Sequence, residues 1–208
     1  MVFKGIDVSR HQGYIDWKET AKHIDFAMLR GGYGGNNFDD KIINNLEGCI
    51  KNNIPFGFYW FSYALSVNDA IEEAEKILFL AKHFKPLYPI AFDFEYDSIR
   101  YANDMRVTIS NKMLIDMTTA FCETIEKAGF YASVYSNQDF INTRYGNDIF
   151  KRFDLWYAWL NETPNRKVNL HQYSHKGTVR GINGLVDLNY AYMDYPSLIK
   201  KHKLNGWT

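Results

Sequence analysis

Residues 54–63 read Ile54-Pro-Phe-Gly-Phe-Tyr-Trp-Phe-Ser-Tyr63, and this almost wholly apolar run predicts a strand that is buried on both faces. Strands of that kind belong to parallel sheets, whose connecting helices cover both sides. The flanking sequence continues the pattern. Apolar runs at 2–8, 26–31, 89–95 and 130–135 alternate with helical patterns at 17–23, 38–52, 68–84 and 110–128. The alternation predicts consecutive βα units through the first two thirds of the chain.

Local signals mark some boundaries of these elements. Asn68 is the expected N-cap of the 68–84 helix, whose first turns are acidic, and Gly129 is the expected C′ residue after the 110–128 helix. The glycine-rich stretch 31–35 lacks the lysine of a phosphate-binding loop. We therefore interpret it as a flexible loop that lines a groove.

After about residue 150 the pattern changes. Residues 155–160, 168–173 and 185–192 are expected strands with no substantial helix between them. The total is eight strands and about five helices, whereas a full eight-fold βα barrel usually needs about 250 residues. We therefore predict an α/β fold, an irregular TIM-like barrel of the (β/α)5(β)3 type, over residues 1–196. Residues 197–208 are expected to form a C-terminal tail or the start of a linker.

The charge balance limits the partners of the chain. Lys plus Arg equals Asp plus Glu at 24 each, so no basic field exists to attract nucleic acid or an anionic membrane. The amino terminus has no basic stretch followed by an apolar run, so we expect no signal peptide and synthesis in a cytoplasm. Cys49 and Cys122 each lie in a helical pattern and are expected to be buried free thiols.

The sequence gives little support for a metal or a cofactor. His11, His171 and His175 lie near expected strand ends, but a scattered histidine is more often a hydrogen-bonded structural residue than a ligand. No nucleophile elbow and no phosphate-binding loop occurs. We predict neither a metal site nor a cofactor.

Four acidic residues lie where the predicted barrel would carry chemistry. Barrel enzymes place their catalytic groups at the carboxyl ends of the strands. Asp7 ends the first strand, Asp93 and Glu95 end the fourth, and Asp187 lies early in the last one. One acid at a strand end often only solvates it or pairs with a nearby arginine. Four acids at the same end of one barrel favour a catalytic site.

Asp93 and Glu95 are the most informative pair. Residues two apart on a strand point to the same face, with Cα atoms about 6.5 to 7 Å apart. Phe92 and Phe94 would then point to the outer helices. Like charges at this range repel, so one acid tends to keep its proton near neutral pH. Glycosidases need this combination of a protonated carboxylic acid and an ionised partner.

The aromatic content, 15 Tyr, 15 Phe and 5 Trp, fits a core, a sugar-binding groove or both. Pyranose rings have apolar faces that stack on aromatic side chains. We expect the core to account for most of the phenylalanines. For Trp60 and Trp156, core packing and a place in the groove are equally favoured.

With these residues identified, the chain resembles glycoside hydrolase family 25, the Chalaropsis-type lysozymes or muramidases, from about residue 3 to residue 193. The resembling segments, in chain order, are Gly5-Ile-Asp-Val-Ser-Arg-His-Gln-Gly13 with Ile15-Asp-Trp17, Phe26-Ala-Met-Leu-Arg-Gly31, Gly57-Phe-Tyr-Trp-Phe61, Asp93-Phe-Glu95, Leu155-Trp-Tyr-Ala158, His171-Gln-Tyr-Ser174 and Val186-Asp-Leu-Asn189. Family members have a barrel of five βα units closed by three further strands, which agrees with the fold predicted above.

The resemblance implies a role for each matching residue. Glu95 would protonate the glycosidic oxygen between N-acetylmuramic acid and N-acetylglucosamine in peptidoglycan. Asp93 would orient the 2-acetamido group of the substrate, which would attack the anomeric carbon and give net retention. Asp7 and Asp187 would bind sugar hydroxyls and adjust the charge of the centre. The candidates for the groove are Tyr59, Trp60, Tyr63, Trp156, Gln172 and Arg30.

Two alternatives stay open: a chitinase or endo-N-acetylglucosaminidase, whose barrels also use Asp-x-Glu at a strand end, and a catalytically silent wall-binding module. Within the resemblance, the missing signal peptide favours the catalytic domain of a phage endolysin from a Gram-positive, clostridial-type host. Such an enzyme would be released through a holin pore and would act on the glycan strands of the wall. Wall-binding repeats would follow this chain.

Overall fold

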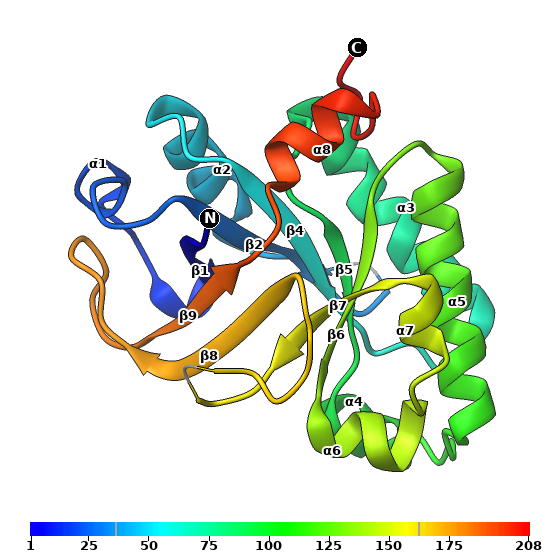
Figure 1. The fold of residues 1–208 in the computed structure, drawn as a ribbon. Helices are drawn as coiled ribbons and strands as arrows, with labels where there is room; N and C mark the ends of the chain where they lie inside the picture. The colour runs from blue at the N-terminus through cyan, green and yellow to red at the C-terminus, as the bar shows by residue number, and fades with distance from the viewer. Residues whose placement is uncertain (36, 162) are drawn as a thin grey trace.

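A computed structural model describes residues 1–35, 37–161 and 163–208, which form a barrel surrounded by helices (Figure 1). The strands are β1 (Phe3–Val8), β2 (Phe26–Tyr33), β3 (Asn37–Phe38), β4 (Phe56–Phe61), β5 (Ile90–Asp93), β6 (Ala132–Asn137), β7 (Asp154–Ala158), β8 (Leu170–Gly177) and β9 (Val186–Ala191). The helices are α1 (Trp17–Thr20), α2 (Ile42–Lys51), α3 (Val67–Phe84), α4 (Tyr96–Asp104), α5 (Asn111–Lys127), α6 (Gln138–Phe140), α7 (Ile149–Arg152) and α8 (Tyr195–Lys201).

Eight of the strands close the barrel in the order β1-β9-β8-β7-β6-β5-β4-β2, and β2 pairs back with β1. The strands from β1 to β8 that form the barrel run parallel, whereas β9 is antiparallel to both of its neighbours. The short strand β3 only extends the edge of β2. In Figure 1, no described helix covers β8 and β9. The structure thus confirms the predicted barrel and its helix-poor last third.

Successive strand residues point alternately into the barrel and outward beneath its cover, as the two-residue period of a strand requires. Inward-facing side chains such as Met28, Ala91 and Leu170 fill the barrel. Outward-facing ones such as Leu29 and Phe92 pack beneath the helices. The interior is therefore a packed core, and a cavity opens where the strands end.

Helices α3 and α5 cover one side of the barrel (Figure 1). Helix α5 begins where the Ser110 hydroxyl accepts a hydrogen bond from the Met113 amide at 3.1 Å. Gly129, with a φ of 83°, follows its end as expected, because a left-handed residue there costs glycine little. The expected start of α3 was wrong. Ser66 is its N-cap rather than Asn68, and its hydroxyl accepts from the Asp69 amide at 3.2 Å.

Only the second half of the glycine-rich stretch 31–35 lies outside a strand: residues 31–33 end strand β2, where we expected a loop, and Gly34 and Gly35 form a turn. The β2–β4 pairing shifts register between Arg30 and Gly32, so one extra residue bulges there. A Cβ atom on Gly31 would lie 2.0 Å from the Ile77 side chain, and one on Gly32 would lie 2.4 Å from the Trp60 ring. Close packing under α3 therefore requires glycine, and the bulge sets the position of Arg30 at the strand end.

The segment after the last strand packs on the barrel, whereas its polar sequence indicated a tail or linker. Helix α8 lies at the end of the barrel opposite α4 and α6 (Figure 1). Tyr195 and Ile199 are fully buried, and the Tyr195 hydroxyl donates to Asp154 at 2.6 Å. Asn205 is also buried and accepts a hydrogen bond from the Tyr131 amide at 2.7 Å. This segment covers the amino ends of the strands, so their carboxyl ends form the open end.

Both cysteines are buried and free, as expected. In the part of the chain that the structure describes, no helix has the length and apolar character needed to cross a membrane.

Candidate active site

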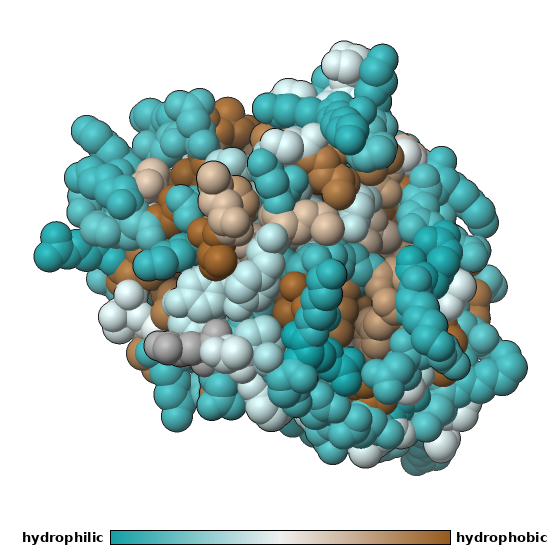
Figure 2. Space-filling model, in the orientation of Figure 1, coloured by the Kyte–Doolittle hydropathy of each residue, from teal (hydrophilic) through white to brown (hydrophobic). Residues whose placement is uncertain are grey.

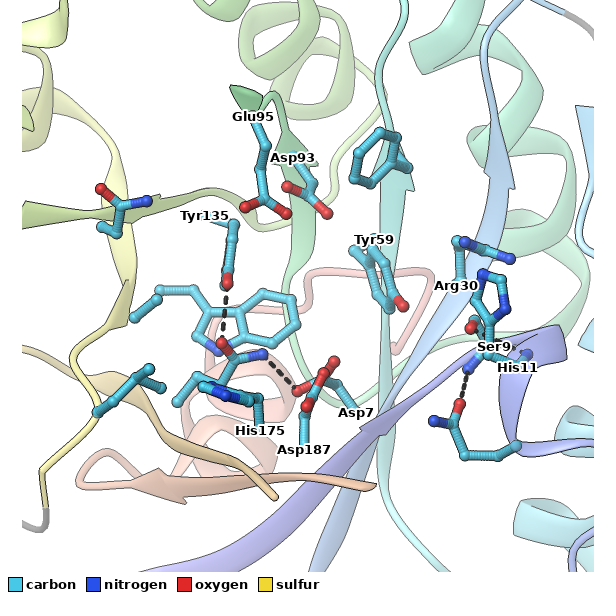
Figure 3. A pocket seen from close by; sticks show the side chains of 17 residues that line it. Asp7, Ser9, His11, Arg30, Tyr59, Asp93, Glu95, Tyr135, His175 and Asp187 are labelled. Carbon is cyan, nitrogen blue, oxygen red and sulfur yellow. Dashed lines mark hydrogen bonds between the residues drawn. The ribbon is translucent and has the colours of Figure 1, made fainter. Parts of the chain in front are cut away.

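A cavity of about 460 Å³ opens at the carboxyl ends of the strands, and it contains all four predicted acids (Figure 3). Asp7 comes from β1, Asp93 from the end of β5 and Asp187 from β9, while Glu95 lies two residues after the end of β5. The other groups that line the cavity are Ser9, His11, Gln12, Arg30, Tyr59, Phe61, Tyr135, Asn137, Trp156, Ala158, Leu160, Gln172 and His175. Tertiary structure thus joins acids that are 180 residues apart in the sequence, from Asp7 to Asp187.

Glu95 lies two residues beyond the end of the strand in which we placed it. Strand β5 ends at Asp93, and Glu95 is the N-cap of α4, a helix that the sequence analysis did not predict. Its backbone is still extended, with φ −127° and ψ −170°, so Glu95 faces the same way as Asp93. Phe92 and Phe94 are buried on the helical side, and Phe92 packs on Phe121 of α5 with ring centroids 4.9 Å apart.

Among the described residues, neither Asp93 nor Glu95 forms an ion pair with an arginine, because Arg30 pairs with Asp39 at 2.7 Å and Arg100 pairs with Asp97. The charge of Arg30 lowers the pKa of Asp93, but burial and the charge of Glu95 have larger, opposite effects. Burial, together with the charges of Asp187 and Asp97, raises the pKa of Glu95 to about 7. Burial raises the pKa of Asp93 as well, and the charge of Glu95 adds to this effect. The pair therefore retains protons at neutral pH that exposed carboxylates would lose.

Asp7 is held by two amide side chains at the opposite wall of the cavity. Its Oδ2 atom accepts hydrogen bonds from Gln172 Nε2 at 3.0 Å and from Asn189 Nδ2 at 2.8 Å. Both amides are themselves fixed, because Gln172 Oε1 accepts from the Tyr135 hydroxyl and Asn189 Oδ1 accepts from Trp156 Nε1, each at 2.8 Å. This buried network fixes the Asp7 carboxyl on that wall of the cavity.

Three aromatic residues form the floor between the two groups of acids. The Trp156 ring packs edge-on against Tyr59, with centroids 5.7 Å apart, and against Tyr135 at 4.9 Å. Figure 3 shows Tyr59 and Tyr135 on either side of the gap between Asp93 and Asp7. Flat apolar faces beside carboxyl groups are the combination that a bound sugar ring requires.

Comparison with known proteins gives a family for this arrangement. A model of the glycosyl hydrolases family 25 matches residues 6–182. The chain belongs to this family.

Individual relatives of this family 25 protein are distant in sequence. The uncharacterized protein YegX of Escherichia coli is 26% identical over 196 residues, which cover 89% of this chain and 68% of YegX. The autolytic lysozyme of Clostridium acetobutylicum is 24% identical over 192 residues, covering 89% of this chain and 55% of that protein. The structure of the modular autolysin LytC from Streptococcus pneumoniae matches with a TM-score of 0.79 at 27% identity, over 92% of this chain and 47% of LytC. This family 25 chain thus spans about half the length of that autolysin. Its family confirms the predicted glycoside hydrolase.

Two residues that we assigned to the groove of this family 25 barrel lie outside the cavity. Trp60 follows the inward-facing Tyr59 and therefore points outward, where it is fully buried and donates to the Gly34 carbonyl at 2.9 Å. Tyr63 lies beyond the end of β4, in an adjoining cavity, and donates to Asp97 at 2.6 Å. Tyr59, Trp156, Gln172 and Arg30 line the main cavity as expected.

The sequence analysis of the family 25 site did not identify Tyr135 and Asn189. Asn189 had a usable signal, because it lies two residues after Asp187 on one strand and so shares its face. Tyr135 closes an expected strand, but nothing in the local sequence indicates that its hydroxyl reaches Gln172.

Of the three histidines that were considered as metal ligands, His11 and His175 line the main cavity, whereas His171 bonds through Nε2 with the Trp159 carbonyl at 2.7 Å. Residues four apart on a strand are about 13 Å apart, which separates His171 from His175. Within the described ranges, no group of three or more His, Cys, Asp or Glu side chains is arranged to hold a metal ion.

Proposed function

We propose that this family 25 barrel is a muramidase that hydrolyses the β-1,4 bond between N-acetylmuramic acid and N-acetylglucosamine in peptidoglycan. The observation that carries the proposal is the Asp93–Glu95 pair at the open end of the barrel, with Asp7 and Asp187 in the same cavity. Two relatives support the choice of substrate. One is an autolytic lysozyme, and the other is an autolysin whose structure contains a synthetic peptidoglycan ligand.

Glu95 is the proposed proton donor. A pKa of about 7 keeps a large fraction of this carboxyl protonated at neutral pH. It gives its proton to the glycosidic oxygen while the bond from that oxygen to the anomeric carbon breaks. General acid catalysis of this kind contributes about 10²- to 10⁴-fold to the rate.

Asp93 is the proposed partner that positions the substrate. Its Oδ1 atom is buried and has no hydrogen-bond partner among the described residues, so it can accept the N–H of a 2-acetamido group. The acetamido oxygen would then attack the anomeric carbon as the leaving group departs. Water would open the resulting ring and return a proton to Glu95, with net retention of configuration.

The test is the identity of the bond that is cut. Purified Gram-positive peptidoglycan is digested, the products are reduced with borohydride, and the new ends are identified by mass spectrometry. Glu95→Gln removes the donated proton with little change of shape. Glu72→Gln makes the same change on the exposed surface of α3 and is the control. New muramitol ends from wild type and from Glu72→Gln, but almost none from Glu95→Gln, are expected.

Other outcomes would select the alternatives. Glucosaminitol ends would move the assignment to a glucosaminidase on the same barrel. A folded protein that sediments with the wall and creates no new ends would be a binding module.

We propose further that the chain acts together with a wall-binding module in an endolysin of a Gram-positive host, released to the wall through a holin pore. LytC is described as modular, and this chain spans 47% of it, which supports a larger assembly. A coding sequence that continues past Thr208 into a repeat module is the expected finding. A native stop codon directly after Thr208 would contradict it.

A further inference from the structure

A second cavity, of about 350 Å³, joins one end of the catalytic cavity. The two cavities share His11, Arg30 and Phe61, so a ligand can extend from one into the other. In Figure 3, Arg30 and His11 lie beyond Tyr59, on the side away from Tyr135. We call this second cavity the basic arm. It is lined by Arg10, His11, Arg30, Tyr33, Phe61, Tyr63 and Asp97.

Arg30 is the buried donor of the basic arm. Its Nε atom is bonded to Asp39, but its Nη2 atom is buried and has no hydrogen-bond partner among the described residues. The side chain is 10% exposed, and the β2 bulge fixes its base. A buried guanidinium N–H without an acceptor is costly, so the geometry calls for an acceptor on a bound molecule.

Tyr33 holds a second arginine beside the first. The guanidinium carbon of Arg10 lies 5.0 Å from the centre of the Tyr33 ring, and that of Arg30 lies 5.4 Å from it. Arg10 Nη1 also donates to the Tyr33 hydroxyl at 2.9 Å. The two cations are thus preorganised around one ring, which lowers the entropy cost of binding an anion.

The acids near the basic arm are already engaged. Asp39 accepts from Arg30 Nε and from two backbone amides, those of Arg10 and Lys41. Asp97 accepts from the Tyr63 hydroxyl and pairs with Arg100. Asp40 lies 3.7 Å from Arg10 Nη1 and is well exposed, so solvent screens it.

The ionisation of His11 agrees with a positive potential in the basic arm. Burial lowers the pKa of His11 below its usual value, and the charges of Arg30 and Arg10 lower it further. The opposing effect of Asp39 is the smallest of the four. The two arginines therefore outweigh the nearest buried acid at this position.

We propose that the basic arm binds a carboxylate on the O3 substituent of N-acetylmuramic acid, most directly a carboxylate of the stem peptide. This inference rests on the proposed function. The acetylated sugars of the glycan are neutral, so the carboxylates of the polymer lie on these substituents. Arginine donors match a carboxylate better than a hydroxyl, because two parallel N–H groups meet two oxygens. The enzyme would then prefer acidic, peptide-bearing strands to neutral ones.

The test compares four soluble substrates prepared from one batch of uncross-linked glycan strands. Peptide-bearing strands, and strands that an amidase has stripped to the lactyl carboxylate, are each assayed before and after their carboxylates are converted to amides. Arg30→Lys keeps a cation beside Asp39 and removes the free Nη2 donor. Arg10→Gln removes the second cation. Lys51 is exposed at the end of α2, on the amino side of the barrel, and Lys51→Gln is the charge-matched control.

For wild type and for Lys51→Gln, amidation of peptide-bearing strands is expected to raise KM about three- to tenfold. In Arg10→Gln and Arg30→Lys, KM for the acidic strands rises to a similar extent, and the effect of amidation largely disappears. If amidation raised KM only for the stripped strands, the basic arm would be assigned to the lactyl carboxylate instead of the peptide. The inference would be overturned if the two arginine variants changed KM equally for acidic and amidated strands, or left KM unchanged. No muramitol ends from wild type on any substrate would instead refute the proposed function.

Discussion

Asp7 and Asp187 are directly paired residues of the antiparallel strands β1 and β9, so their side chains lie on the same face of the sheet. Carboxylates at this separation repel each other, so one of the two tends to keep its proton. Burial and the charge of Asp187 raise the pKa of Asp7 well above its usual range, which favours Asp7 as the protonated member. The charge of Asp187 also raises the pKa of Glu95, which links the two sides of the cavity.

Replacing Asp187 by Asn is therefore expected to lower the pKa of Glu95. If Glu95 acts as the acid, activity falls as pH rises through its pKa of about 7. In Asp187→Asn, the alkaline limb of the pH profile of kcat/KM should then move to lower pH. This shift is separate from any loss of maximal rate. Asp97→Asn should cause a smaller shift in the same direction, because Asp97 contributes less. The measurement is the release of soluble glycan across pH 4 to 9, and an unmoved limb in both variants would contradict the electrostatic link.

The raised pKa of Glu95 also predicts how Glu95→Gln changes stability with pH. The folded protein binds this proton more tightly than the unfolded chain, whose carboxyl has an ordinary pKa of 4.5. Wild-type stability therefore decreases as pH rises from 4.5 through about 7, and Gln is free of this effect. Glu95→Gln should exceed wild type by about 1–3 kcal/mol at pH 8 and show no such gain at pH 4. Urea unfolding at both pH values measures the difference, and a gain of equal size at pH 4 would argue against it.

Asn189 is expected to matter most for stability among the amides of the site. Asn189→Leu leaves both the Asp7 carboxyl and the Trp156 indole N–H short of a buried partner. The free energy of unfolding should fall by about 2–4 kcal/mol. Tyr135→Phe removes only one donor from the same network and should cost about 1 kcal/mol. Urea denaturation measures both losses. Losses of similar size in the two variants would contradict the prediction that Asn189 contributes more to stability than Tyr135.

Gly5 tests the packing of the barrel interior. A Cβ atom at this position would lie 2.4 Å from the Phe26 ring, which is stacked on Tyr88 with centroids 4.4 Å apart. Gly5→Ala should therefore lower the free energy of unfolding by about 1–3 kcal/mol through overpacking. The double variant with Phe26→Leu should recover part of this loss, because the smaller side chain makes room. Thermal melts of both single variants and the double variant measure the coupling, and strict additivity would show that the two positions do not clash.

Much of the fold could be predicted from the sequence because its signals are local. The apolar run at 54–63 and its counterparts fix the strand positions, since a strand that is apolar on both faces must be covered on both. Gly129 marks a helix end because only a residue tolerant of positive φ fits there. Asp7, Asp93 and Glu95 were predicted to meet because parallel strands bring their carboxyl ends to one rim, whereas Asp187 reaches that rim because β9 is antiparallel to its neighbours.

Only the tertiary structure decided which side chains reach the cavity and what ionisation states they favour. Tyr59 and Trp60 are adjacent aromatic residues, and both were predicted to line the groove. In the barrel, Tyr59 points into the interior, whereas Trp60 packs beneath the helices. Residues 197–208 appear polar, but Ile199 and Asn205 are buried, and Asn205 is held by a hydrogen bond with Tyr131, 74 residues away. The raised pKa of Glu95 and the unpartnered Arg30 Nη2 arise from burial among groups distant in sequence. Desolvation and charge–charge effects depend on distances in space, and a linear sequence does not contain those distances.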